Sequence, residues 1–195
     1  MTETNNQRKA NYKINPIYIE RWSPRAYLNK EISDETLNCL FEAARWAPSA
    51  ANVQPWRFII ARSDTDRAKF LTFINDGNKK WCDKAPVLVA VTSLKNWKVD
   101  SDDINPTHGF DTGAAWGFLS LEAIRQGLHT HAMGGFNREK AKEVLEIPDN
   151  YDVHAIIAIG YKGEKEMLDE SLQQREIPSN RKPIEEFVFE GVFRK

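Results

Sequence analysis

The segment "FDTGAAWGFLSLEAIRQG", residues 110–127, constrains the fold more than any other part of the chain. Its spacing predicts a helix of about five turns that is closed by Gly127. In the stretch "GAAWGFLSLEAI" the apolar residues go nearly all the way round the helix. A helix that is apolar on every side needs cover on every side. In a chain of 195 residues, that cover comes either from one central core or from a second subunit.

Two glycines, Gly113 and Gly117, lie one turn apart in this helix. Each glycine in a helix interior costs roughly 1 kcal/mol relative to alanine, so the pair needs a compensating reason. Glycines at this spacing permit another helix to approach closely. We therefore interpret the pair as a place of close contact.

Charge and composition exclude several classes of partner. Lysine and arginine number 27 and aspartate and glutamate 28, which argues against the broad basic surface used for nucleic acid or anionic membranes. No apolar run approaches the length of a membrane span, and "MTETNNQRKANYKIN" lacks the apolar centre of a signal peptide. The two cysteines form no disulfide framework. We predict one cytoplasmic domain over residues 1–195, with residues 1–15 as a flexible arm.

Helix and strand signals alternate along the chain without internal repeats, which is typical of an α/β or α+β sandwich with a central sheet. Ser33 and Asn137 stand where helix N-caps are expected. Residues 85–93, "APVLVAVTS", are almost wholly apolar, as in a strand of a sheet covered on both faces. The expected strands are 57–61, 85–93 and 153–161, and the expected helices are 34–44, 66–76, 110–127 and 137–147.

The loop "RWAPSAANVQPWRF", residues 45–58, combines features that neither a solvent loop nor a core segment requires. Two prolines and two tryptophans bound it, and three residues inside it, Ser49, Asn52 and Gln54, donate and accept hydrogen bonds. The pattern predicts a loop that holds a flat object with a polar edge.

Basic side chains recur at two places. Arg21, Ser23 and Arg25 alternate in "RWSPRAY", and in an extended segment they point the same way. Two guanidiniums and a hydroxyl on one face suit a phosphate, although a solvated surface strip has the same pattern. Arg181 and Lys182 form a second basic pair in an otherwise acidic tail.

The stretch "LHTHAMGGFN" adds a further candidate. Gly134 and Gly135 follow an apparent strand, and their backbone either approaches a flat ligand or forms a simple turn. His129 and His131 share a strand face, but no nearby cysteine or carboxylate completes a ligand set, so we predict no metal site. We interpret Cys39, within an amphipathic helix, as ordinary packing.

In their order along the chain, these motifs resemble the FMN-dependent nitroreductase family. The order is R-x-S-x-R, then A-R-W-A-P-S-x-x-N-x-Q-P-W, D-x-G-A-A before a long apolar helix, G-G-F and R-K-P. The match covers roughly residues 17–189, and residues 45–56 are its most distinctive part. The resemblance implies an α+β sandwich whose central, mostly antiparallel sheet is flanked by helices. It also implies an intertwined homodimer with two FMN sites at the subunit interface.

The resemblance assigns a role to each motif. The loop around Ser49 borders the flavin ring, the glycine pair approaches its N5 and O4 edge, and Arg21 and Arg181 hold the phosphate. Arg25, with Lys80, faces the N1 and O2 side of the ring. The implied cofactor-binding residues are Arg21, Trp22, Ser23, Arg25, Pro48, Ser49, Asn52, Gln54, Lys80, Met133, Gly134, Gly135, Arg181 and Lys182.

The sequence departs from the family pattern in three places. Ala50 replaces a second serine in the loop, and "HTHAM" replaces a cysteine and a proline before G-G-F. The segment 94–108 lacks the acidic-aromatic lid that flavin-dependent dehalogenases of the same fold carry.

The resemblance implies an oxidoreductase that takes a hydride from NADH or NADPH through FMN and passes it to a nitroaromatic, a quinone or a similar acceptor. Donor and acceptor share one pocket, which implies ping-pong kinetics, and no side chain acts as a catalytic acid or base. The absence of a G-x-G-x-x-G turn fits a nicotinamide nucleotide that binds only transiently. A reductive dehalogenase, a flavin-modifying enzyme and a non-enzymatic flavin-binding sensor are the alternatives.

Overall fold

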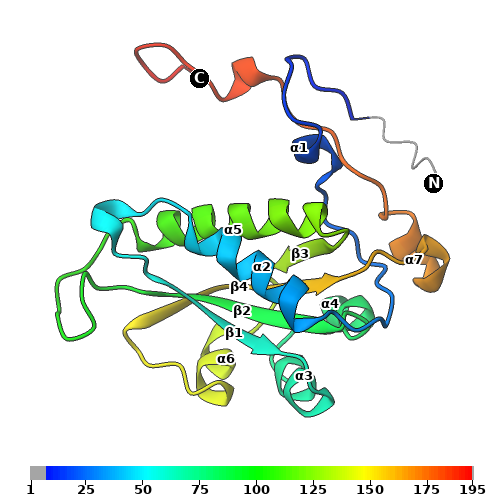
Figure 1. Ribbon diagram of the computed structural model, residues 1–195, viewed down its shortest axis with the longest axis horizontal. Coiled ribbons are helices and arrows are strands. Elements are labelled where there is room, and N and C mark those ends of the chain that lie inside the picture. Colours follow the sequence, from blue (N-terminus) through cyan, green and yellow to red (C-terminus); the bar gives the residue numbers. More distant parts are fainter. Residues whose placement is uncertain (1–7, 195) are drawn as a thin grey trace.

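The computed structural model describes residues 8–194, and within them a single four-stranded sheet forms the centre (Figure 1). The strands are β1 (Trp56–Ala61), β2 (Val87–Leu94), β3 (His129–Met133) and β4 (Tyr151–Gly160). Their order across the sheet is β1-β2-β4-β3, and each neighbouring pair is antiparallel. The predicted α+β class with a mostly antiparallel sheet is therefore confirmed.

Helices cover both faces of this sheet (Figure 1). The α-helices of the body are α2 (Asp34–Arg45), α3 (Asp64–Leu71), α4 (Asp76–Cys82), α5 (His108–Arg125) and α6 (Arg138–Val144). On one face Val87, Val89 and Val91 of β2 join the core beneath α2 and α5, whereas Leu88 and Ala90 join the opposite core with α3, α4 and α6. Alternate side chains of a strand point to opposite faces, so β2 must be apolar at every position, as its sequence predicted.

The helix ends follow the capping signals in most places. The Ser33 hydroxyl accepts the Thr36 N–H at 3.1 Å, and the Asn137 side chain accepts the Lys140 N–H at 3.0 Å. Gly127 closes α5 with φ of 72°, a left-handed conformation that glycine adopts without strain. The helix predicted over 137–147 ends at Val144, and Glu146 adopts φ of 52° beyond it.

The helix predicted over residues 66–76 is wrong. The structure has two helices, α3 ending at Leu71 and α4 beginning at Asp76, and Gly77 lies inside the second. Between them the backbone of 73–75 pairs with 135–137: the Asn137 N–H donates to Phe73 O at 2.8 Å and the Asn75 N–H to Gly135 O at 3.0 Å. This tertiary pairing interrupts the helix and buries Phe73 in the core.

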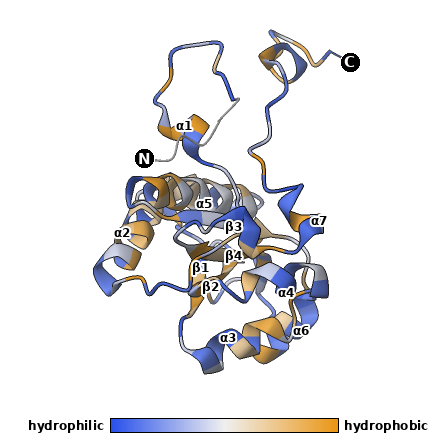
Figure 2. Ribbon diagram, turned by 90° about the vertical axis from the view of Figure 1, so that its right-hand side faces the viewer, coloured by the Kyte–Doolittle hydropathy of each residue, from blue (hydrophilic) through white to orange (hydrophobic). Residues whose placement is uncertain are grey.

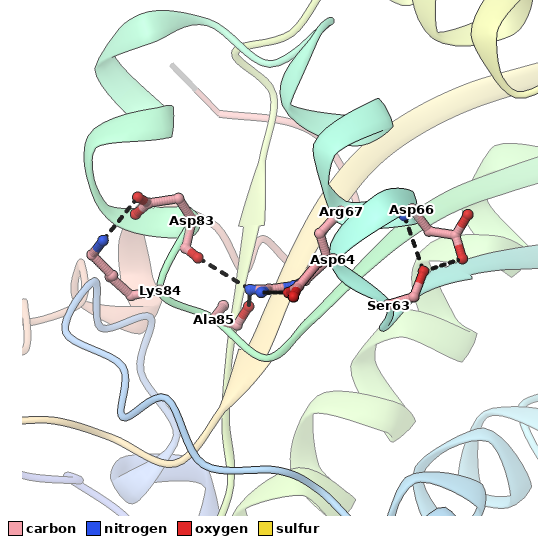
Figure 3. A network of polar contacts seen from close by, with 7 residues as sticks. All are labelled: Ser63, Asp64, Asp66, Arg67, Asp83, Lys84 and Ala85. Atoms are coloured by element: carbon pink, nitrogen blue, oxygen red, sulfur yellow. Dashed lines mark hydrogen bonds and ion pairs between the residues drawn. The ribbon is translucent and has the colours of Figure 1, made fainter.

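Arg67 fixes the new connection between α3, α4 and β2 (Figure 3). Its Nη1 donates to Asp83 O at 3.1 Å and to Ala85 O at 3.0 Å, while its Nη2 donates to Asp64 at 2.7 Å. One side chain thus ties the start of α3 to the turn that precedes β2.

The two ends of the described chain leave the body together (Figures 1 and 2). They carry α1 (Ile17–Glu20), α7 (Glu170–Gln173) and the short 3-10 helix Ile184–Glu186, and two further 3-10 turns are Ala50–Asn52 and Lys165–Met167. Residues 1–7 of the predicted flexible arm lie outside the described residues. Within residues 8–194, Arg8 Nη1 donates to Ile19 O at 2.6 Å and to Arg21 O at 2.9 Å. No helix in residues 8–194 is long and apolar enough to cross a membrane.

Candidate functional site

The loop between α2 and β1 has an unusual backbone. Ala51, Asn52 and Gln54 adopt φ of 48°, 55° and 51°, the left-handed region that residues other than glycine seldom enter. Such residues persist where surrounding contacts fix them. Here the Ser49 hydroxyl accepts the Gln54 N–H at 3.0 Å, and Gln54 Nε2 donates to the Asn52 carbonyl at 3.0 Å. The polar residues that the sequence singled out therefore hold one another in a rigid loop.

Asp111 anchors this loop to the first turn of α5. Its Oδ2 accepts the Ala50 N–H and the Thr107 hydroxyl, each at 3.1 Å, and the residue is only 4% exposed. Sequence reasoning used Asp111 only as part of D-x-G-A-A and missed this role. The signal was an acidic residue inside an otherwise apolar helix, which requires a buried partner.

Flanking residues of the loop differ in their environment. Trp56 is buried in the core beneath α2, whereas Trp46 is exposed and donates through Nε1 to Glu42. Pro48 is exposed beside it. The loop therefore presents its Pro48–Asn52 side to the outside while its second tryptophan packs inside.

Three arginines gather where the two ends of the chain meet. Arg21 Nη1 lies 3.4 Å from the Ser23 hydroxyl, so these two predicted residues do share one side. Burial, and then repulsion from Arg181 and Arg8, lowers the pKa of Arg21. Neither Arg21 nor Arg181 has a carboxylate partner in an ion pair within residues 8–194. The like charges of Arg21 and Arg181, which lack a carboxylate partner within residues 8–194, favour an anion. Arg8 lies near both and is the member of the cluster that the sequence reasoning missed.

The other predicted cations, Arg25, Lys182 and Lys80, do not join the cluster of Arg8, Arg21 and Arg181. Arg25 Nη1 lies 3.3 Å from Arg175 O and 3.8 Å from Glu176 Oε2, so it turns toward the segment after α7. Lys182 pairs with Glu186 at 3.3 Å within the exposed tail. Lys80 is exposed on α4. The structure therefore separates Arg21, Ser23 and Arg181 from the three remaining candidates for a charged contact.

The Arg21–Arg25 segment packs against β3. Trp22 meets the His129 ring edge-on at 6.5 Å between centroids, and His131 Nδ1 lies 2.9 Å from Pro24 O. A carbonyl oxygen only accepts, so His131 carries its proton on Nδ1. Burial is the main cause that lowers the pKa of both histidines to about 4, and both are therefore neutral near pH 7. No group of three metal-ligating side chains occurs in the described part of the chain.

Gly134 and Gly135 follow β3, but neither uses the left-handed freedom of glycine. A Cβ on Gly135 would lie 2.7 Å from Asn78 Nδ2, which donates to the Gly135 carbonyl at 3.2 Å. A Cβ on Gly134 would meet no described atom within 4 Å. A side chain at position 135 would have to displace the Asn78 side chain of α4, whereas Gly134 presents bare backbone. The Met133 side chain belongs to the core, which leaves only its backbone for a ligand.

These elements form two separate halves in one chain. The loop is attached at the N-terminal end of α5 through Asp111, while Trp22 contacts His129, just beyond the C-terminal end of α5. The helical rise places Asp111 and Arg125 about 20 Å apart. A single chain therefore does not bring the loop to the arginine cluster.

Along α5, one apolar stripe remains uncovered. Phe110 is 81% exposed and Phe118 is 43% exposed, and a Cβ on Gly113 or Gly117 would meet no described atom within 4 Å. These four residues recur at helical spacing and define the α5 stripe. Ala115, Leu119 and Ala123 pack in the core, so the all-round apolar pattern reflects a core face plus an open face.

Two buried side chains within residues 8–194 that could be nucleophiles, Ser93 and Cys82, are not open to a ligand. Ser93 is fully buried and its hydroxyl lies 2.7 Å from His108 Nδ1 and 2.6 Å from His154 Nε2 beneath the start of α5. Burial raises the pKa of the Cys82 thiol to about 12. Neither group is therefore placed to act as a nucleophile on a bound ligand.

Comparison with known proteins agrees with this geometry. The Nitroreductase family model matches residues 18–80 and 67–161. A protein of Archaeoglobus fulgidus, provisionally named NADH dehydrogenase/NAD(P)H nitroreductase, is 31% identical over 158 residues, covering 78% of this chain and 87% of the relative. The NADH dehydrogenase of Thermus thermophilus is 27% identical over 201 residues, and the match covers 87% of this chain and 92% of the relative.

A crystal structure described as an oxidoreductase containing FMN has the same fold. It is 40% identical, with a TM-score of 0.92, and the match covers 100% of this chain and 99% of that one. The chain is an α+β protein that belongs to the nitroreductase family.

Proposed function

We propose that this protein is an FMN-dependent oxidoreductase that uses NADH or NADPH to reduce electron-poor acceptors such as nitroaromatics or quinones. The observation that carries the proposal is the uncompensated pair Arg21 and Arg181 beside Ser23. Support comes from the similar structure described as containing FMN and from relatives named NAD(P)H nitroreductase and NADH dehydrogenase.

The residues present fit FMN. Forked guanidinium donors match phosphate oxygens, and an anion at Arg21 and Arg181 would remove the repulsion between them. The open backbone at Gly134 gives a flat ring space to approach. The carboxamides of Asn52 and Gln54 match alternating donors and acceptors on a flavin edge.

We further propose that a homodimer completes the site. If two copies pack their α5 stripes together in antiparallel fashion, the N-terminal end of one α5 lies beside the C-terminal end of the other. A two-fold interface of this kind brings the loop around Ser49 of one copy to the Arg21 cluster of its partner. The about 20 Å separation within one chain is then bridged by symmetry.

FMN, when bound, would supply the two-electron chemistry between the nicotinamide donor and the acceptor. The chain's own residues bind and orient. Arg21, Ser23 and Arg181 hold the phosphate, Asn52 and Gln54 hold the ring edge, and Arg25 stabilises negative charge on the ring. Donor and acceptor use the same opening in turn, so kinetics are of the ping-pong type.

The test begins with the protein reconstituted with FMN and washed free of excess cofactor. We expect a yellow protein with one FMN per chain and turnover of NADH or NADPH with menadione or a nitroaromatic. Parallel lines in double-reciprocal plots would support the shared opening. A flavin-loaded protein without turnover would favour the sensor alternative, and a colourless protein would contradict FMN binding itself.

A further inference from the structure

The backbone of residues 24–26 lies outside the strands of the sheet, yet side chains from two distant elements hold it. Glu176 Oε1 accepts the Arg25 N–H at 2.7 Å and the Ala26 N–H at 2.9 Å. From the other side His131 donates to Pro24 O at 2.9 Å. The Trp81 ring packs against His131 at 4.5 Å between centroids and fixes its orientation.

Glu176 and Asp111 are the two buried acidic residues within residues 8–194. The Glu176 side chain is 3% exposed, and its second oxygen, Oε2, has no hydrogen-bond partner in the described residues. That oxygen lies 3.8 Å from Arg25 Nη1. A buried carboxylate that lacks a full set of partners is costly, and two backbone N–H groups require only an acceptor, not a charge.

The two N–H groups therefore account for the acceptor of Glu176 but not for its negative charge. Arg25 is the cation that this charge faces. Arg25 also lies near Arg175, a second positive charge that repels it. A guanidinium paired with a buried carboxylate attracts a second anion less strongly than an isolated one does.

We propose that Glu176 is a positioning residue for Arg25 and offsets part of its charge, so that Glu176 sets how strongly Arg25 favours reduced over oxidised FMN. The inference rests on the proposed function, in which Arg25 faces the flavin ring. Reduced flavin carries more negative charge on its ring than oxidised flavin. A less compensated Arg25 would hold the reduced form more tightly.

Glu176→Gln separates this idea from simple anchoring, because glutamine keeps the Oε1 acceptor and replaces the charged Oε2 with a neutral NH2 group. The flavin midpoint potential is measured by spectroelectrochemical titration, with FMN affinity and thermal unfolding of the apoprotein recorded beside it. We expect a preference for reduced FMN about tenfold greater than in the parent, which raises a two-electron midpoint by about 30 mV. Glu170→Gln, an exposed change in α7, is the matched control and should leave the midpoint unchanged.

The Arg25→Gln background gives the second arm. Without Arg25 the carboxylate is uncompensated, so the midpoint should fall by at least the same amount even if Glu176→Gln does not fold. In the double variant, Glu176→Gln should raise the midpoint from the Arg25→Gln value back toward the parent value. The size of this rise should not exceed the shift that either single change produces. An FMN-loaded Glu176→Gln protein with the parent midpoint overturns this inference alone. An Arg25→Gln protein without a fall overturns this inference together with the role of Arg25 at the ring, while FMN binding and turnover stand. A parent protein that binds no FMN overturns the proposed function and this inference together.

Discussion

Ala50 has no polar side chain, yet its N–H fixes the loop by donating to the buried Asp111 Oδ2 at 3.1 Å. Where the family pattern has a second serine, this chain therefore relies on the backbone of the same position. Asp111, His131 and Glu176 act alike: each is a side chain that positions backbone more than 50 residues away.

At the residue scale, Asp111→Ala tests the anchor. The change removes the acceptor of the Ala50 N–H and of the Thr107 hydroxyl, so the free energy of unfolding in urea should fall by about 1–3 kcal/mol. FMN affinity should fall as well, since the left-handed residues of the loop lose their support. Glu122→Ala, at the other end of α5, is the control. An unchanged FMN affinity in Asp111→Ala would separate the loop from the cofactor.

Arg21→Ala and Arg181→Ala test the phosphate contact. Each should weaken FMN binding by about 1.5–3 kcal/mol, the range for a hydrogen bond to a charged group. Riboflavin, which lacks the phosphate, should bind these variants as it binds the parent. Arg125→Ala removes an exposed, paired arginine and serves as the control. Equal FMN affinity in all three variants would return Arg21 and Arg181 to the surface-strip interpretation.

At the scale of the element, the two sides of α5 have different environments. Ala115, Leu119 and Ala123 pack in the core, whereas the stripe of Phe110, Gly113, Gly117 and Phe118 lies open. Within one chain the glycines have no packing reason, although each weakens the helix. A close neighbour on that face supplies the reason.

Gly117→Ala and Gly117→Leu distinguish the single chain from the dimer. In a monomer a Cβ at position 117 meets no described atom within 4 Å, and alanine should stabilise the helix by about 1 kcal/mol. In a dimer with closely packed helices, leucine should force the copies apart. Size-exclusion chromatography with light scattering should show a dimeric parent and a more readily dissociating Gly117→Leu. A monomeric parent, or a leucine variant that dimerises equally well, would refute the antiparallel arrangement.

At the scale of the whole molecule, acid stability reports on the packing behind the arginine cluster. His129 and His131 have pKa values of about 4 in the folded protein, against 6.5 ordinarily, chiefly because burial disfavours the charged ring. The unfolded chain therefore binds more protons between these values, and folding stability decreases as pH falls from 6.5 toward 4. Burial lowers the pKa of His154 too, which acts in the same direction.

Urea unfolding at pH 7.5 and pH 5 measures this effect. Each histidine contributes up to about 1.4 kcal/mol per pH unit in that window. His129→Gln, whose Nδ1 has no partner in the described residues, should reduce the difference between the two pH values. A variant with the parent's full pH dependence would show that other groups account for it.

Local signals predicted much of this molecule because they act within a few residues. The continuous apolar run of β2, the caps at Ser33 and Asn137 and the stop at Gly127 each depend on neighbours one turn or one strand step away. The order of the motifs also identified the family, which the comparisons confirm. The assignment of individual residues to FMN stays a prediction, as do the dimer and the role of Lys80.

What the sequence determined by itself is most of the helices and strands of the body, the two-sided burial of β2 and the residue types that suit a flavin. Only the tertiary structure decided that residues 73–75 leave the helix to pair with 135–137, and that Arg8 joins Arg21 and Arg181. It alone revealed that Asp111 and Glu176 anchor distant backbone, with partners 61 and 150 or 151 residues away. The physical reason is that a hydrogen bond or a buried charge depends on distance in space, and local periodicity carries no information about which distant segments meet.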